Sequence, residues 1–172
     1  IRLGNAQSPI DLAVQALSLK AVGPKNEVKL DASVRLASLA TRDARVDGIV
    51  ASLHSDTFDL DAKSGPFSVS ATADRIDLDS AAAPLLAGPV RADATGSFST
   101  DTLVIDRGTV RGPAINGIVG GRVFLADGSI SLNVAADALS SALPAAARGL
   151  LGERTRLSAG LKRDALGNIA VE

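Results

Sequence analysis

The feature that most constrains this chain is a strict alternation of apolar and polar side chains between positions 28 and 36. The apolar positions are Val28, Leu30, Ala32, Val34 and Leu36, and charged or hydroxyl side chains separate them. A period of two puts alternate side chains on opposite faces of a β-strand, whereas a helix needs a period of 3.6. At about 3.3 Å per residue, this strand is roughly 30 Å long. The chain must therefore supply a sheet with one apolar face.

Similar alternation recurs along most of the sequence, so the expected fold class is all-β. We predict a mostly antiparallel, curled sheet of about ten to twelve strands with one or two short helices. The apolar phase slips near Ala16, which predicts a bulge in the first long strand. The pair Asp127-Gly128 between two apolar runs predicts a hairpin. The other expected strands include 46–53 and 58–62, joined by a connection at 54–57, and 67–73, 76–79, 90–98, 103–105, 123–125, 130–134, 157–161 and 169–171.

Two segments rich in Ala and Leu interrupt the alternation, and we expect helix at 80–87 and 138–151. Pro84 falls near the first turn of the first segment, where a missing N–H is tolerated. The expected order of strands and helix in residues 76–112 recurs loosely at 132–172, where Gly152 and Gly160 correspond in position to Gly88 and Gly96. We interpret residues 1–172 as a single β-rich segment, cut from a longer repetitive protein, with a degenerate internal repeat.

Composition excludes several classes of function. Apolar residues make up 46% of the chain, but many are Ala, and the aromatic residues are four Phe with no Trp or Tyr. Such side chains fill a thick core poorly and suit a thin sheet with one apolar face. The net charge is −1 and basic residues are scattered, so we expect no nucleic-acid partner. The absence of Cys excludes disulfides and thiol catalysis, and no apolar run approaches the length of a membrane-spanning helix.

Candidate sites for chemistry are few, and each has an ordinary explanation. His54 with Asp56 and Asp59 would make a poor transition-metal site, so a solvated turn histidine is the simpler interpretation. Paired carboxylates can perform acid–base chemistry or hold calcium, and Asp59 with Asp61 is one such pair. Asp77 with Asp79 is the other, and the polar face of a strand is the simpler interpretation of both pairs.

The motifs of common enzymes are missing. No G-x-S-x-G sequence is present, and residues 117–121 lack the spacing of a dinucleotide-binding loop and precede no expected helix. We therefore expect neither an enzyme nor a bound metal or cofactor.

Four pieces of the sequence carry a resemblance to a known family. They are Ile76-Asp77-Leu78-Asp79, the segment 82–90 (Ala-Ala-Pro-Leu-Leu-Ala-Gly-Pro-Val), Leu103-Val104-Ile105-Asp106, and the segment 115–123 (Ile-Asn-Gly-Ile-Val-Gly-Gly-Arg-Val). This order of pieces resembles the TamB and AsmA-like family of Gram-negative envelope proteins. The resemblance covers residues 70 to 172, and the earlier part of the chain is similar to the family only in the general character of its sequence.

The resemblance implies a fold and a function. The sheet would curl into a β-taco, a U-shaped trough with an apolar interior, in the periplasm, within a parent protein anchored in the inner membrane. The trough would carry phospholipid acyl chains between the inner and outer membranes, and an Omp85-type (TamA-like) outer-membrane barrel would be the partner. The alternative is an assembly factor for outer-membrane β-barrel proteins and autotransporters that acts by β-strand pairing. A third possibility is a purely structural β-array.

These possibilities differ in what they require of the apolar face. A conduit requires an open apolar trough, an assembly factor requires an available sheet edge, and a structural array requires a filled core. For a conduit, we expect thirteen side chains to line one groove: Val28, Leu30, Val34, Leu36, Phe67, Val69, Val90, Phe98, Val119, Val123, Ile130, Leu132 and Val134.

Overall fold

The computed structural model describes residues 2–5, 8–41, 44–79, 83–142, 153–164 and 169–171. Of these residues, 75% are in strands, which confirms the all-β fold class. The strands are β1 (Arg2–Asn5), β2 (Ser8–Val22), β3 (Val28–Ala40), β4 (Ala44–Phe58), β5 (Gly65–Ala73), β6 (Arg75–Leu78), β7 (Val90–Phe98), β8 (Thr102–Arg111), β9 (Ile115–Phe124), β10 (Ile130–Leu139), β11 (Arg154–Arg163) and β12 (Ile169–Val171). One helical turn, α1 (Ala83–Leu86), precedes β7, and a 3₁₀ turn, η1 (Ser140–Ala142), follows β10.

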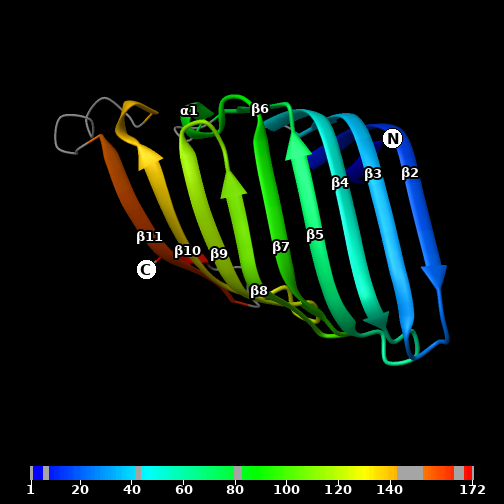
Figure 1. The fold of residues 1–172 in the computed structure, drawn as a ribbon. Coiled ribbons are helices and arrows are strands. Elements are labelled where there is room, and N and C mark those ends of the chain that lie inside the picture. Colours follow the sequence, from blue (N-terminus) through cyan, green and yellow to red (C-terminus); the bar gives the residue numbers. More distant parts are fainter. Residues whose placement is uncertain are drawn as a thin grey trace.

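All twelve strands belong to one antiparallel sheet, in which most neighbours in sequence are also neighbours in space. The order runs β1-β2-β3-β4-β5-β7-β8-β9-β10-β11-β12, and β6 pairs with β4 off this path. The sheet is curved rather than flat (Figure 1), and its dark blue N-terminal end lies behind β4 and β5 in that view. The path has two ends, so the sheet is open and forms a trough along its hollow side.

The strand register separates apolar from polar side chains. One row of direct partners crosses the sheet from β2 to β11 through Leu19, Ala32, Leu53, Val69, Ala94, Gly108, Val119, Val134 and Ala159. We call the face with this row the inner face. The adjacent row lies on the opposite, outer face and runs through Ser18, Ser33, Ser52, Ser70, Asp93, Thr109, Ile118, Ala135 and Ser158.

Bulges at several points help the sheet to curl. The register of β2 against β3 shifts on both sides of Val14, which confirms the bulge expected near Ala16. Further shifts occur between Thr95 and Gly96 and between Ile105 and Gly108. Each bulge sets an extra residue on one strand against its neighbour, which bends the sheet and increases its twist.

The expected connection at 54–57 is wrong. Residues 44–58 form one continuous strand, β4, and the chain turns after Phe58, so the strand expected at 58–62 is absent. The polar run from His54 to Thr57 looks like a turn in the sequence. In the sheet, however, β4 lies between two neighbours, and Ser55 pairs with Leu30 of β3 across a shifted register. Pairing with flanking strands therefore outweighed local turn preference.

The helices are also shorter than the sequence predicts. α1 spans only Ala83–Leu86, and the expected residues 80–82 lie outside the described part of the chain. Ala138 and Leu139 belong to β10 rather than to a helix, only 140–142 form a 3₁₀ turn, and residues 143–152 lie outside the described residues. Within the described residues, no helix is long and apolar enough to cross a membrane.

The hairpin expected at Asp127-Gly128 is confirmed. Gly128 adopts a φ of 70°, and its N–H donates to the carbonyl of Phe124 at 2.9 Å, between β9 and β10. The proposed repeat pairs Gly96 with Gly160. Gly96 lies opposite Phe67 on the inner face, whereas Gly160 lies opposite Asn133 on the outer face. The two segments therefore differ by one residue in register.

Candidate functional site

The register places all thirteen residues expected to line a groove on the inner face. They come from β3, β5, β7, β9 and β10, and most of their direct partners on neighbouring strands are apolar or glycine. The exceptions are Ser55, which pairs with Leu30, and Arg163, which pairs with Ile130. Only Val28, Leu36 and Val90 among them are buried, at 3%, 9% and 8% exposed. The others retain contact with solvent, so the inner face is apolar but incompletely covered.

Part of the inner face borders a partly open cavity of about 510 Å³ between β3 and β8, which we call the apolar cavity. Its walls come from five strands and are formed by Leu30, Leu53, Ser55, Phe58, Gly65, Pro66, Phe67, Val69, Ala94, Phe98, Leu103 and Ile105. Residues on five successive strands can line one space only if the sheet curls around it. Its size falls within the usual range for pockets that hold small molecules, about 300–1,000 Å³.

Three of the four phenylalanines border this cavity. The rings of Phe58 and Phe98 stack with centroids 6.3 Å apart, although β5 lies between their strands. Phe67 lies across from Gly96, and a Cβ built at Gly96 would be 3.0 Å from the ring and would collide with the Val104 carbonyl. The missing side chain at Gly96 therefore gives the Phe67 ring its place.

Ser55 is the polar exception in the cavity wall. The inner positions of β4 run Ile49, Ala51, Leu53 and Ser55, since each pairs with an inner residue of β3. Ser55 is 3% exposed, and its Oγ has no hydrogen-bond partner among the described residues. Ser55 was not predicted to line the groove, because the polar run 54–57 is typical of a connection between strands. Extending the alternation of β4 by one more step would have found it.

The inner face opens to solvent toward β2. Leu17 and Leu19 lie on this face opposite Val34 and Ala32, yet they are 76% and 73% exposed. No large side chain among the described residues is completely buried. An ordinary core forms when a second layer covers an apolar face, and the described part of the chain supplies no such layer.

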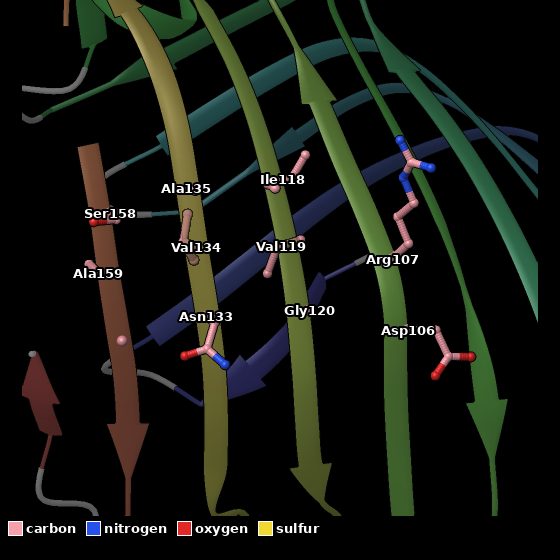
Figure 2. A pocket seen from close by; sticks show the side chains of 11 residues that line it. Asp106, Arg107, Ile118, Val119, Gly120, Asn133, Val134, Ala135, Ser158 and Ala159 are labelled. Atoms are coloured by element: carbon pink, nitrogen blue, oxygen red, sulfur yellow. The ribbon is translucent and has the colours of Figure 1, made fainter. Parts of the chain in front are cut away.

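A second hollow of about 660 Å³ lies on the outer face between β8 and β11 (Figure 2). Asp106 and Arg107 border one side, and Asn133 and Ser158 lie toward the other. Gly120 and Gly160, which have no side chains, also line the hollow. In this view the blue N-terminal strands cross behind β9 and β10. The hollow is larger than the apolar cavity, but its mixed walls suit water as well as a ligand.

Short ion pairs join residues two positions apart on the same strand, and they were not predicted from the sequence. Arg91 Nε and Asp93 lie 2.9 Å apart on the outer face, and Arg45 Nε and Asp47 lie 3.0 Å apart at the start of β4. A spacing of two residues puts both side chains on one face of a strand, so the pattern Arg-x-Asp was the available signal. Hydrogen bonds from Arg91 and Ser70 hold the pKa of Asp93 down to about 2.

His54 lies on the outer face of β4 rather than in a turn. Its Nδ1 is 2.7 Å from Asp31 and its Nε2 is 3.2 Å from Asp56. The hydrogen bond to Asp31, followed by that to Asp56, raises the pKa of His54 above its ordinary value. The carboxylates lie at opposite nitrogens of the ring, so these groups do not converge on one point. Within the described residues, no cluster of three His, Cys, Asp or Glu is arranged to hold a metal ion.

In each carboxylate pair considered from the sequence, one Asp makes a local structural contact. Asp59 Oδ1 accepts hydrogen bonds from the backbone N–H groups of Asp61 and Ala62, with N···O distances of 2.8 Å in both cases. Asp59 therefore stabilises the turn after β4. Asp61 lies in that turn and not on a strand face. Asp77 forms an ion pair with Arg75 at 2.9 Å, and Asp79 is exposed beyond the end of β6.

The chain matches no protein-family model, and comparisons with curated proteins and with solved structures also give no match. Function must therefore be argued from the trough itself.

Proposed function

We propose that this chain is a segment of an apolar conduit that carries phospholipid acyl chains between the inner and outer membranes. The observation that carries the proposal is an inner face that is apolar from β2 to β11 but not filled. An acyl chain needs a continuous apolar lining and no directional hydrogen bonds, and apolar surface removed from water contributes about 25 cal/mol per Å². The resemblance to the TamB and AsmA-like family supports a periplasmic location and an Omp85-type partner.

The test compares a charge on each face of the same strand. Val34→Asp places a carboxylate on the inner face, and Ser33→Asp places it on the adjacent, exposed outer position. A charge in an apolar path cannot be solvated by its walls, so the inner variant should bind much less lipid. Leu132→Arg and Asn133→Arg form a second pair on β10.

Binding is measured by native mass spectrometry after incubation with phosphatidylethanolamine vesicles. Circular dichroism and protease resistance first establish that each variant is folded, because an inner charge can also unfold a sheet. We expect Ser33→Asp to retain lipid and folded Val34→Asp to lose most of it. Equal lipid binding by both folded variants would rule out the conduit.

A second function is favoured by the free edge of β2. β1 pairs only with the start of β2, through Asp11, so Ala13 to Val22 have no strand on that side among the described residues. An unpaired edge with exposed Leu17 and Leu19 is a template for pairing with another strand. The chain would then act as an assembly factor for outer-membrane β-barrel proteins by β-augmentation.

Proline substitutions distinguish the two functions. Successive N–H groups of a strand point to opposite edges, so Ser18→Pro and Leu19→Pro are tested separately, and one of them removes a donor from the free edge. An assembly factor should lose binding of an unfolded outer-membrane β-barrel protein in that variant, while lipid binding persists. Loss of lipid binding without loss of protein binding would favour the conduit instead.

A further inference from the structure

Two adjoining hollows on the outer face of β8 to β11 form one groove, which we call the outer groove. The hollow of about 660 Å³ and a smaller one of about 370 Å³ share Arg107, Ile118 and Ala135 in their walls. The floor comes from β9 and β10, where Gly120 pairs with Asn133 and Ile118 pairs with Ala135. β8 forms one side of the groove and β11 the other. A chain segment lying along the floor would therefore be flanked on both sides.

Three side chains along this groove have no partner within the described part of the chain. Arg107 and Arg111 of β8 are exposed and form no ion pair there, whereas Arg91 on the same face pairs with Asp93 at 2.9 Å. Ile118 is 55% exposed, and outside β2 no large apolar side chain of the described residues is more exposed. Two guanidinium groups and one apolar side chain are therefore available to a ligand.

The charge of the groove favours an anion. Its walls contain Arg107, Arg111 and Arg156 against Asp106 and Asp137. The Asp137 carboxylate is already bound by Arg156, whose Nε lies 3.0 Å away. Asp106 forms no ion pair with either remaining arginine. Guanidinium groups bind carboxylates through charge-assisted hydrogen bonds, so acidic groups are the natural ligands here.

The three side chains are spaced like alternate residues of an extended polypeptide. Arg107 and Arg111 are four residues apart on β8, so their Cα atoms are roughly 13 Å apart. Ile118 pairs with Thr109, which lies midway between the two arginines. An extended polypeptide has the same rise per residue and points residues i, i+2 and i+4 to one side. An acidic, an apolar and an acidic residue at these positions can meet all three side chains.

The polar side chains of the groove suit the backbone of such a segment. Asn116 and Asn133 offer amides, and Thr109 and Ser158 offer hydroxyls. Every residue of an extended segment carries an N–H donor and a C=O acceptor, which these groups can satisfy. A flat membrane surface could reach the two arginines but would leave the floor uncovered.

We infer that the outer groove binds an extended acidic segment of a partner protein, with two carboxylates four residues apart and one apolar side chain between them. Arg107 and Arg111 bind the carboxylates, and the apolar side chain packs against Ile118. This site lies on the face opposite the proposed conduit, so each can be tested without the other.

The experiment measures binding of a fluorescein-labelled peptide, Ser-Glu-Thr-Leu-Thr-Glu-Ser, by fluorescence anisotropy. A rearranged peptide, Ser-Glu-Glu-Leu-Thr-Thr-Ser, has the same composition and charge without the required spacing. Arg111→Gln is compared with Arg122→Gln, which removes an exposed charge from the outer face of β9 outside the groove. Circular dichroism first establishes that each variant is folded.

We expect the spaced peptide to bind several-fold more tightly than the rearranged one. Arg107→Gln and Arg111→Gln should each weaken its binding by roughly two- to fivefold, the range for one exposed ion pair. Arg122→Gln should leave binding unchanged. Ile118→Ala should weaken binding of this peptide but not of a version with alanine in place of leucine. Added salt should also weaken binding, because it screens exposed charges.

Three results would overturn the inference. Equal binding of the two peptides would show that the groove does not recognise the spacing. Equal losses in Arg111→Gln and Arg122→Gln would show that only the general charge of the face matters. Failure of both peptides to bind would exclude an acidic segment, and binding of phosphatidylglycerol vesicles through Arg107 and Arg111 would then identify a membrane-contacting face. The proposed conduit survives each result, because the Val34→Asp test concerns the inner face.

Discussion

Two parts of the sheet, β3 to β8 and β9 to β11, follow the same alternation of apolar and polar residues. They differ in the size of the side chains on the inner face. In the first part, Phe58, Phe67 and Phe98 converge on one cavity. In the second, the inner positions include Gly117, Gly121 and several alanines, and Val134 is 38% exposed. Alternation therefore decides which face is apolar, whereas side-chain volume decides whether that face encloses a space or stays shallow.

The largest expected change in the free energy of unfolding comes from replacing a glycine in each of the two parts. A methyl group at Gly96 would collide with the Val104 carbonyl and meet the Phe67 ring, whereas one at Gly117 would lie 3.6 Å from Ala135 and Ala136 atoms. Gly96→Ala should destabilise the fold by about 2–3 kcal/mol. Gly117→Ala should be neutral or stabilising by about 0.5–1 kcal/mol, because alanine loses less backbone entropy on folding. Urea unfolding measures both, and similar losses in the two variants would contradict the comparison.

A smaller effect tests the aromatic side chains. Phe67→Ala removes a half-buried ring from the cavity, so it should cost about 2 kcal/mol, below the range for fully buried rings. Val119→Ala in the shallow part should cost about 1 kcal/mol or less. Urea unfolding gives both values, and binding of the probe cis-parinaric acid, a fluorescent fatty acid, should weaken more in Phe67→Ala. If Val119→Ala weakened probe binding more, the shallow part would be the main binding surface.

The smallest effect concerns the outer face of the first part. The pKa of His54 is raised from its ordinary value of 6.5 by Asp31 and Asp56. The charged ring therefore contributes stability that is fully present below about pH 6.5 and is lost as the pH rises through the folded pKa. NMR titration should give a pKa above 6.5 in the wild-type chain and a lower value in Asp31→Asn. Probe binding should be the same in both, and any change in it would couple the outer face to the cavity.

The sequence determined the fold class and the apolar face. A period of two places side chains on alternate faces wherever a strand forms, so Val28, Val69 and Leu132 could be assigned to one face without knowing their neighbours. The phase slip at Ala16 and the turn at Gly128 were equally local signals. Both were confirmed because the physical cause, a backbone constraint, acts within a few residues.

The tertiary structure decided what local signals could not. Residues 54–57 resemble a turn, yet pairing with β3 makes them part of β4 and places Ser55 in the cavity wall. The predicted helix at 138–151 begins instead as the end of β10, because Ala138 pairs with Ile115. The cavity itself depends on five strands curling around one space, and curvature arises from bulges, glycines and contacts between distant residues. Such contacts have no period in the sequence, so only the folded sheet determines them.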